Sequence, residues 1–168
     1  MNELMDNRES IIKLYSDGPN MLESVLSGLS GKNLDLSESE EKWTIRQIVH
    51  HVVDGDDIWN IFIKRAIGNP DGKFDLDWYW EIPQDDWVVK WSYGLRDIEP
   101  SLALFHSNRG HIIQLLAHIP ESWNHNLSIN WPNDDLQEAT IAEVVDMQAN
   151  HVVGHINDIK KVRIIHGI

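Results

Sequence analysis

The sequence predicts an all-α protein, and three observations carry that prediction. Four stretches repeat apolar residues at helical spacing, the segments between them are rich in Gly, Pro, Asn and Asp, and no stretch sustains strand alternation. With 168 residues, 42% of them hydrophobic, the chain can bury one sizeable core, and no shift in composition marks a second domain. We therefore expect residues 1–168 to form a single helical-bundle domain.

The first helix is expected over residues 9–29. Gly18 and Pro19 predict a break or restart within it, because proline has no amide hydrogen to continue the helical hydrogen bonds. Ser30 and Gly31 then predict its end.

Helix breakers bound the second and third helices. The second is expected over residues 44–67, with Gly-Asn-Pro at 68–70 directly after it. The third is expected over residues 92–119, ahead of Pro120, and Pro100 inside this range marks an alternative start.

The fourth helix is expected over residues 140–166, just before Gly167. It opens with a Thr-Ile-Ala-Glu capping box, in which Thr140 and Glu143 satisfy free backbone amides. The connections before and after the third helix are about 20 residues long, which is long for an up-and-down bundle. They predict a crossover topology or small strands, such as one at residues 127–131.

Charge and hydropathy narrow the classes of partner. Acidic residues outnumber basic ones by 27 to 14, and the formal net charge of −13 would repel a phosphate backbone, so no nucleic-acid partner is expected. No window approaches the ~20 apolar residues of a membrane span, and the first ten residues are too polar for a signal peptide. These features predict a cytoplasmic protein that acts on a small molecule and binds no membrane.

Two residue types stand out by their number. Cysteine is absent, so any metal must bind to His, Asp or Glu. Four of the eight tryptophans fall between Trp78 and Trp91. Such a group of tryptophans most simply covers part of the core, and it also suits a lid, a ligand pocket or a subunit interface.

A homodimer is a further expectation, because Trp and Ile on outer helix faces would otherwise be solvated.

Three of the nine histidines fall on inner faces of the expected helices. At about 100° per residue, His51 lies on the rim of the apolar stripe of the second helix, whereas His50 lies on the far side. On the fourth helix His155 lies inside the stripe, and His151 lies on its edge one turn away. Residues four apart on a helix have Cβ atoms about 5–6 Å apart, so the two imidazoles can share one metal ion.

A metal centre of His51, His151 and His155 would be of the catalytic type. Three imidazole ligands without cysteine favour Zn or Ni, with Fe or Mn as further options, and they leave a position open for water or substrate. A ligating imidazole is neutral and donates its other ring nitrogen to a carboxylate or carbonyl. Asp54 and Asp158, each three residues after a candidate ligand, are expected in that supporting role, with solvated surface acids as the alternative.

Arg109 falls within the apolar face of the third helix, and Asn108 lies near its edge. A charge on an apolar face is costly unless it is paired or lines a wet pocket. We take both residues as candidates for lining the pocket. No catalytic residue beyond the metal ligands is indicated by the sequence.

Two motifs resemble those of a known family. Residues 43–54, WTIRQIVHHVVD, resemble the W-S/T-x-R-E/Q-I/V-L/V-x-H-L/V-x-D signature of the DinB/YfiT-like metalloenzymes. Residues 140–159, TIAEVVDMQANHVVGHINDI, look like that family's closing motif, T-L/I-x-E followed by H-x3-H. Order and spacing agree, and the resemblance spans nearly the whole chain.

This resemblance implies a DinB-like four-helix bundle with long connections. It also implies that the last histidine of the first motif and both histidines of the second ligate a divalent ion, which assigns His51, His151 and His155. Relatives include metal-dependent transferases that use low-molecular-weight thiols. The resemblance therefore favours a thiol-dependent S-transferase acting on small electrophiles, with a thiol as co-substrate.

Two other functions stay open. Water on a zinc ion held by three histidines can have a pKa near 7, so a metal-dependent hydrolase of a small ester or amide is the nearest competing enzyme. From another class, a non-catalytic bundle could bind a small hydrophobic ligand or a partner through its Trp-rich segment.

Overall fold

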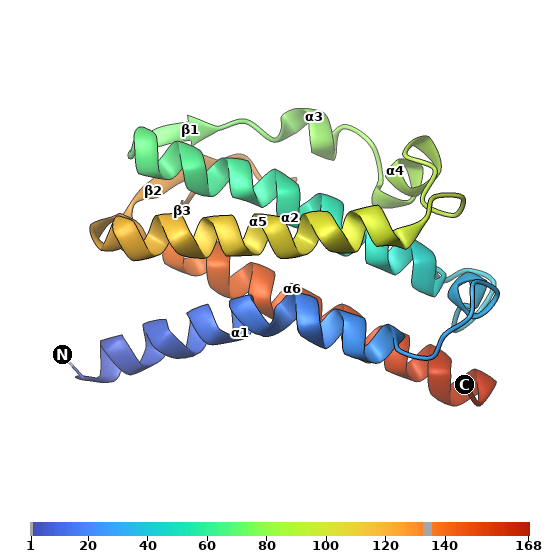
Figure 1. Ribbon diagram of the computed structural model, residues 1–168. Helices are drawn as coiled ribbons and strands as arrows, with labels where there is room; N and C mark the ends of the chain where they lie inside the picture. Colours follow the sequence, from blue (N-terminus) through green and yellow to red (C-terminus); the bar gives the residue numbers. More distant parts are fainter. Residues whose placement is uncertain (1, 133–135) are drawn as a thin grey trace.

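The computed structural model describes residues 2–132 and 136–168 and confirms the all-α fold. The bundle consists of four long helices that lie along one another (Figure 1): α1 (Asn2–Leu26), α2 (Ile45–Gly68), α5 (Ile98–His118) and α6 (Ile141–His166). Within the described residues, no helix combines the length and the apolar character that a bilayer span requires.

The connections make the topology a crossover one. Helices α2 and α5 run in the same direction, and α1 and α6 run in the opposite direction (Figure 1). Helix α1 packs mainly on α5 and α6, and α2 packs on the same two helices. The chain must therefore travel back along the bundle between α2 and α5, as the long connection predicts.

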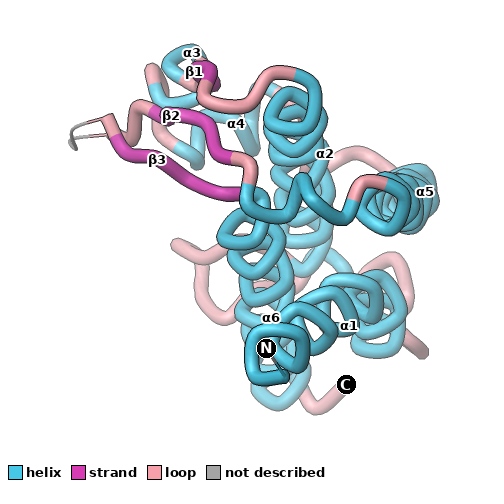
Figure 2. The backbone as a smooth tube through the Cα atoms, turned by 90° about the vertical axis from the view of Figure 1, so that its left-hand side faces the viewer, coloured by secondary structure: helices cyan, strands magenta, loops and turns pink. Residues whose placement is uncertain are grey.

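Short elements fill these connections. η1 (Asn33–Asp35) precedes α2, and the returning segment between α2 and α5 contains β1 (Gly72–Phe74), α3 (Asp77–Trp80) and α4 (Gln84–Lys90). The last connection contains η2 (Pro120–Asn124), β2 (Asn126–Ile129) and β3 (Gln137–Thr140). Strand β2 pairs in parallel with β1 and antiparallel with β3, and the sheet lies beside α2 and α6 (Figure 2). The strand expected near residue 127 is thus present.

Local signals set the starts of three helices. Thr44 and Thr140 form capping boxes with Gln47 and Glu143 at the starts of α2 and α6. The expected start of α5 at residue 92 is wrong, because Ser92 has a left-handed φ of 54°. The helix begins at Ile98 instead, which leaves Pro100 in the first turn, where proline is accepted.

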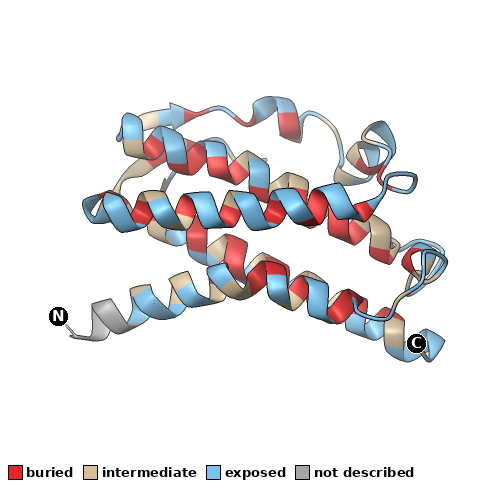
Figure 3. Ribbon diagram, in the orientation of Figure 1, coloured by how far each residue is buried: buried red, intermediate tan, exposed pale blue. Residues whose placement is uncertain are grey.

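The four helices turn their buried faces toward one another (Figure 3). Their apolar side chains form two separate clusters along the bundle. One cluster includes Phe62 and Ile112, and the other includes Val49 and Phe105. On α5 the boundary between the clusters falls at Arg109, a buried charge.

Arg109 contacts the other three long helices. Its Nε and Nη2 donate to Oδ1 of Asp56 on α2 at 3.0 and 2.9 Å. Its Nη1 donates to the Tyr15 carbonyl on α1 at 2.7 Å, and Nη2 donates to the Gln148 carbonyl on α6 at 3.0 Å. Both Arg109 and Asp56 are only 1% exposed, so the two charges are paired inside the core.

The Gly18-Pro19 pair does not break α1, and the expected break is wrong. Pro19 has no amide hydrogen for the Tyr15 carbonyl four residues earlier, and Arg109 supplies the missing donor. Gly18 makes room for this contact, because a Cβ at that position would collide with Nη1 of Arg109. The helix continues because a side chain from α5 replaces the donor that proline lacks.

We predict that Arg109→Met lowers the free energy of unfolding by roughly 3–5 kcal/mol, because Asp56 is left buried without its charged partner. Urea unfolding followed by circular dichroism measures the loss. The double variant Arg109→Met/Asp56→Leu removes both charges and should recover part of the stability. A single variant as stable as the parent would contradict the role given to this pair.

Candidate metal centre

Helices α2 and α6 bring three histidine side chains to one point. Nε2 of His151 lies 3.2 Å from Nε2 of His51 and 3.1 Å from Nε2 of His155. The candidate ligand atoms of all three residues lie within 4.8 Å of one another. The i, i+4 spacing on α6 and the packing of α6 against α2 therefore produce the cluster that the sequence predicts.

These distances fit a divalent cation. With metal–nitrogen bonds of about 2.0–2.1 Å, two imidazole nitrogens on a tetrahedral ion are about 3.3 Å apart. The Nε2 atom of His151 also faces two other Nε2 atoms at once, and one ring nitrogen cannot donate a single proton to both. A cation among the three nitrogens would satisfy all of them.

The environment keeps the three imidazoles neutral, as ligation requires. Burial, together with the neighbouring His151 and His155, lowers the pKa of His51 to about 3. Burial also lowers the pKa of His151 to about 4, with contributions from His155 and Arg109. The pKa of His155 is lowered by burial as well, although Asp158 opposes the change.

Of the two expected supporting carboxylates, only Asp158 lies at a candidate ligand. Its Oδ2 is 3.4 Å from Nδ1 of His155, beyond a strong hydrogen bond, and its Oδ1 accepts from Lys161 Nζ at 3.1 Å. Asp54 instead lies 3.4 Å from Arg96 Nη1, so its expected role at a histidine is wrong.

Arg109 and Asn108 do not line the cavities beside the histidines, which corrects the expectation for both. Arg109 is the paired charge in the core, the other outcome that the sequence left open. Asn108 donates from Nδ2 to Oδ1 of Asp57 at 2.9 Å, on the rim between α5 and α2. Arg109 still affects the site, because its charge contributes to the lowered pKa of His151.

His50 is not a ligand, but it is fully buried rather than on a free face of α2. Its Nδ1 lies 2.9 Å from Oγ of Ser101, and its Nε2 lies 3.2 Å from the Arg96 carbonyl. Helical periodicity placed His50 on the far side from the apolar stripe of α2. That side is also buried, because α5 and the segment before it cover it.

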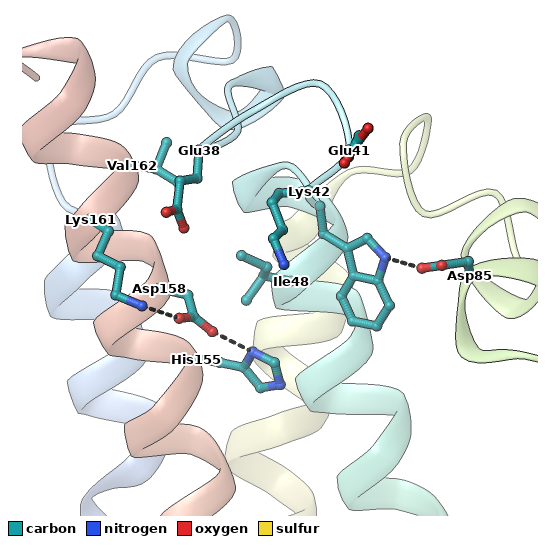
Figure 4. Close-up of a pocket in the computed structure, with 10 residues that line it drawn as sticks. Glu38, Glu41, Lys42, Ile48, Asp85, His155, Asp158, Lys161 and Val162 are labelled. Atoms are coloured by element: carbon teal, nitrogen blue, oxygen red, sulfur yellow. Dashed lines mark hydrogen bonds and ion pairs between the residues drawn. The ribbon is translucent and has the colours of Figure 1, made fainter.

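A charged cavity of about 360 Å³ opens beside His155 (Figure 4). Trp43 forms part of its wall, packs edge-on against the His51 ring at 4.6 Å between centroids, and donates from Nε1 to Asp85 at 2.7 Å. Most of the remaining wall is acidic or basic, namely Glu38, Glu41, Lys42, Asp85, Asp158 and Lys161, and Ile48 and Val162 complete it.

A second cavity, of about 160 Å³, lies against His51 and His151. Its wall is mostly aromatic and aliphatic, and it includes Ile58, Trp59, Leu76, Tyr79, Trp80, Trp131 and Met147. Two of these aromatic residues belong to the Trp-rich segment, and Trp87 stacks on Tyr79 behind them. A ligand pocket is one of the roles that the tryptophan density predicts for that segment, whereas nothing in the sequence indicates Trp59 or Trp131.

Fold and site together define a crossover helical bundle with a three-histidine candidate metal centre. The chain belongs to the DinB superfamily, whose family model matches residues 14–159. No curated protein matches the chain significantly.

One matching solved structure is that of YfiT from Bacillus subtilis, described as a probable metal-dependent hydrolase with an unusual four-helix bundle topology. The identity is 19% and the TM-score is 0.81, and the match covers 95% of this chain and 87% of the other. At this identity the likeness establishes the DinB-like four-helix bundle fold.

We predict that the metal-free protein loses stability as the pH falls below about 6.5. Between that value and the lowered pKa values of His51 and His151, the unfolded chain binds more protons than the folded chain, so acid favours unfolding. Urea unfolding between pH ~7.5 and ~4.5 measures the slope. Replacing both histidines by alanine should make the decline shallower, and an unchanged slope would contradict the assignment.

Proposed function

We propose that this protein is a divalent-metal-dependent enzyme with His51, His151 and His155 as ligands. The observation that carries the proposal is the convergence of three neutral Nε2 atoms between two cavities. An all-histidine ligand set favours Zn or Ni ahead of Fe or Mn. With three protein ligands, a bound ion would keep at least one coordination position for water or substrate.

A bound divalent cation lowers the pKa of a thiol or water and so supplies an anionic nucleophile at neutral pH. The chain's own contribution is to hold the ligands neutral and to position two reactants. Burial keeps the histidines unprotonated, and the charged and aromatic cavities provide separate places for chemically different groups.

We favour thiol-dependent S-transfer to a small electrophile as the reaction. The sulfur–carbon bond forms as the bond from carbon to the leaving group breaks, the leaving group takes that electron pair, and the thiol proton passes to solvent. Lys42 and Lys161 offer cations for the carboxylates of an amino-acid-like thiol, and Glu38 and Glu41 offer anions for its amine. The aromatic cavity would then receive the electrophile.

Hydrolysis of a small ester or amide is the second candidate. The description of the YfiT structure as a probable metal-dependent hydrolase favours it. In that case the oxygen of water bonds to the carbonyl carbon as the bond from that carbon to the leaving oxygen or nitrogen breaks. The leaving atom takes the electron pair of the broken bond and a proton from the water, and departs as an alcohol or amine. The same three histidines would serve, and the charged cavity would hold part of the substrate instead of a thiol.

We predict that the full chain, purified without a histidine tag, binds one divalent ion and that His51→Ala weakens this binding by roughly 100-fold or more. Elemental analysis after dialysis, with titration of Zn²⁺ and Ni²⁺, measures both. His111→Ala is the matched control, because His111 is exposed on α5 and lies outside the cluster. Equal metal content in the parent and His51→Ala would overturn the metal centre.

The reaction is tested on the metal-loaded protein. Conjugation of monochlorobimane is followed with a panel of low-molecular-weight thiols, and hydrolysis is followed with ester and amide panels. We expect conjugation above the uncatalysed rate with at least one thiol, lost in His51→Ala and kept in His111→Ala. Hydrolysis without conjugation would reject S-transfer in favour of the second candidate.

A further inference from the structure

Two side chains that line the aromatic cavity, Trp80 and Gln148, each carry a buried polar atom without a hydrogen-bond partner. Nε1 of Trp80 and Oε1 of Gln148 are both inaccessible to solvent, and neither has a partner among the described residues. Gln148 as a whole is only 4% exposed. Both side chains line the cavity of about 160 Å³ that also touches His51 and His151. Since more than nine in ten buried polar groups in proteins are paired, two unpaired ones in one cavity point to a ligand.

The two atoms have complementary chemistry. The indole nitrogen of Trp80 can only donate, and the amide oxygen of Gln148 can only accept. A ligand that satisfies both must accept one hydrogen bond and donate another. A hydroxyl does this with a single oxygen, and a carboxamide does it with its oxygen and its nitrogen.

The size and lining of the cavity define the rest of the ligand. An apolar cavity of about 150 Å³ in another protein binds benzene, so this space suits one ring of that size. The rings of Trp59, Tyr79 and Trp131 line it and offer faces and edges for stacking. Among the described residues, none with a formal charge lines it, so away from the proposed metal a charged group would lose its hydration without gaining a counter-ion.

We propose that this cavity binds a small neutral ring that carries a hydroxyl or a carboxamide, held by Trp80 and Gln148. The inference rests on the proposed function, because it identifies the part of the substrate that lies beside the metal ligands. The two cavities then bind reactants of different polarity. The uncharged ring enters between α2, α3 and α6, and charged groups enter on the side of His155.

The test uses phenol and toluene, two probes of nearly the same shape that differ in the hydroxyl. Binding to the full chain, as purified and after loading with Zn²⁺, is followed by two-dimensional NMR of the tryptophan indole groups. Trp80→Phe assigns the Trp80 signal. We expect phenol to shift that signal, and we expect Trp80→Phe and Gln148→Met each to weaken phenol binding by about 2- to 10-fold.

Trp80→Phe also removes two carbons of the cavity wall, so its effect on toluene measures the loss of packing, and phenol should lose more affinity than toluene. Gln148→Met keeps most of the apolar wall, so toluene binding should be unchanged in that variant. Trp78→Phe is the matched control, since Trp78 lies in the same segment but does not line the cavity. Equal effects of Trp80→Phe on phenol and toluene, or no shift of the Trp80 signal by phenol, would overturn the inference. Either result would mean that the two polar groups do not bind this part of a ligand.

These outcomes are separable from failure of the proposed function. Metal binding without phenol binding would reject the ring site and leave the metal-dependent enzyme intact. Phenol binding that depends on Trp80 and Gln148, in a chain that binds no metal, would keep the ring site and reject the metalloenzyme.

Discussion

The buried contact of Arg109 with Asp56 is the constraint on which the rest of the bundle depends. It lies on the boundary between two apolar clusters and joins α5 to α1, α2 and α6. A buried charge without partners would cost several kcal/mol, so the four helices can slide past one another only by breaking this set of hydrogen bonds. The buried hydrogen bonds of Arg109 therefore fix the positions of all four helices relative to one another along the bundle axis.

The fixed positions of α2 and α6 along the bundle axis also place the candidate metal centre. Asp56 lies five residues after His51 on α2, and Gln148 lies three residues before His151 on α6. Because Arg109 binds both, it sets the register in which the histidines of the two helices meet. It also adds a positive charge that helps to keep His151 neutral.

The connections between the four long helices supply much of the wall of both cavities. They contribute Trp43 and Asp85 to the charged cavity, and Tyr79, Trp80 and Trp131 to the aromatic one. The two cavities therefore differ in chemistry although they flank one ligand cluster.

The sequence by itself determined the four long helices, the capping boxes at Thr44 and Thr140 and the one-turn spacing of His151 and His155, because these depend on neighbours within one or two turns. His51 reaches that pair only through the packing of α2 against α6. Only the tertiary structure decided the features that need distant partners. Pro19 stays inside α1 because Arg109 replaces its missing donor, and His50 is buried because α5 and the segment before it cover a second face of α2. Helical periodicity reports one apolar face at a time, so it cannot show which polar residues meet across the bundle or which connections close a cavity.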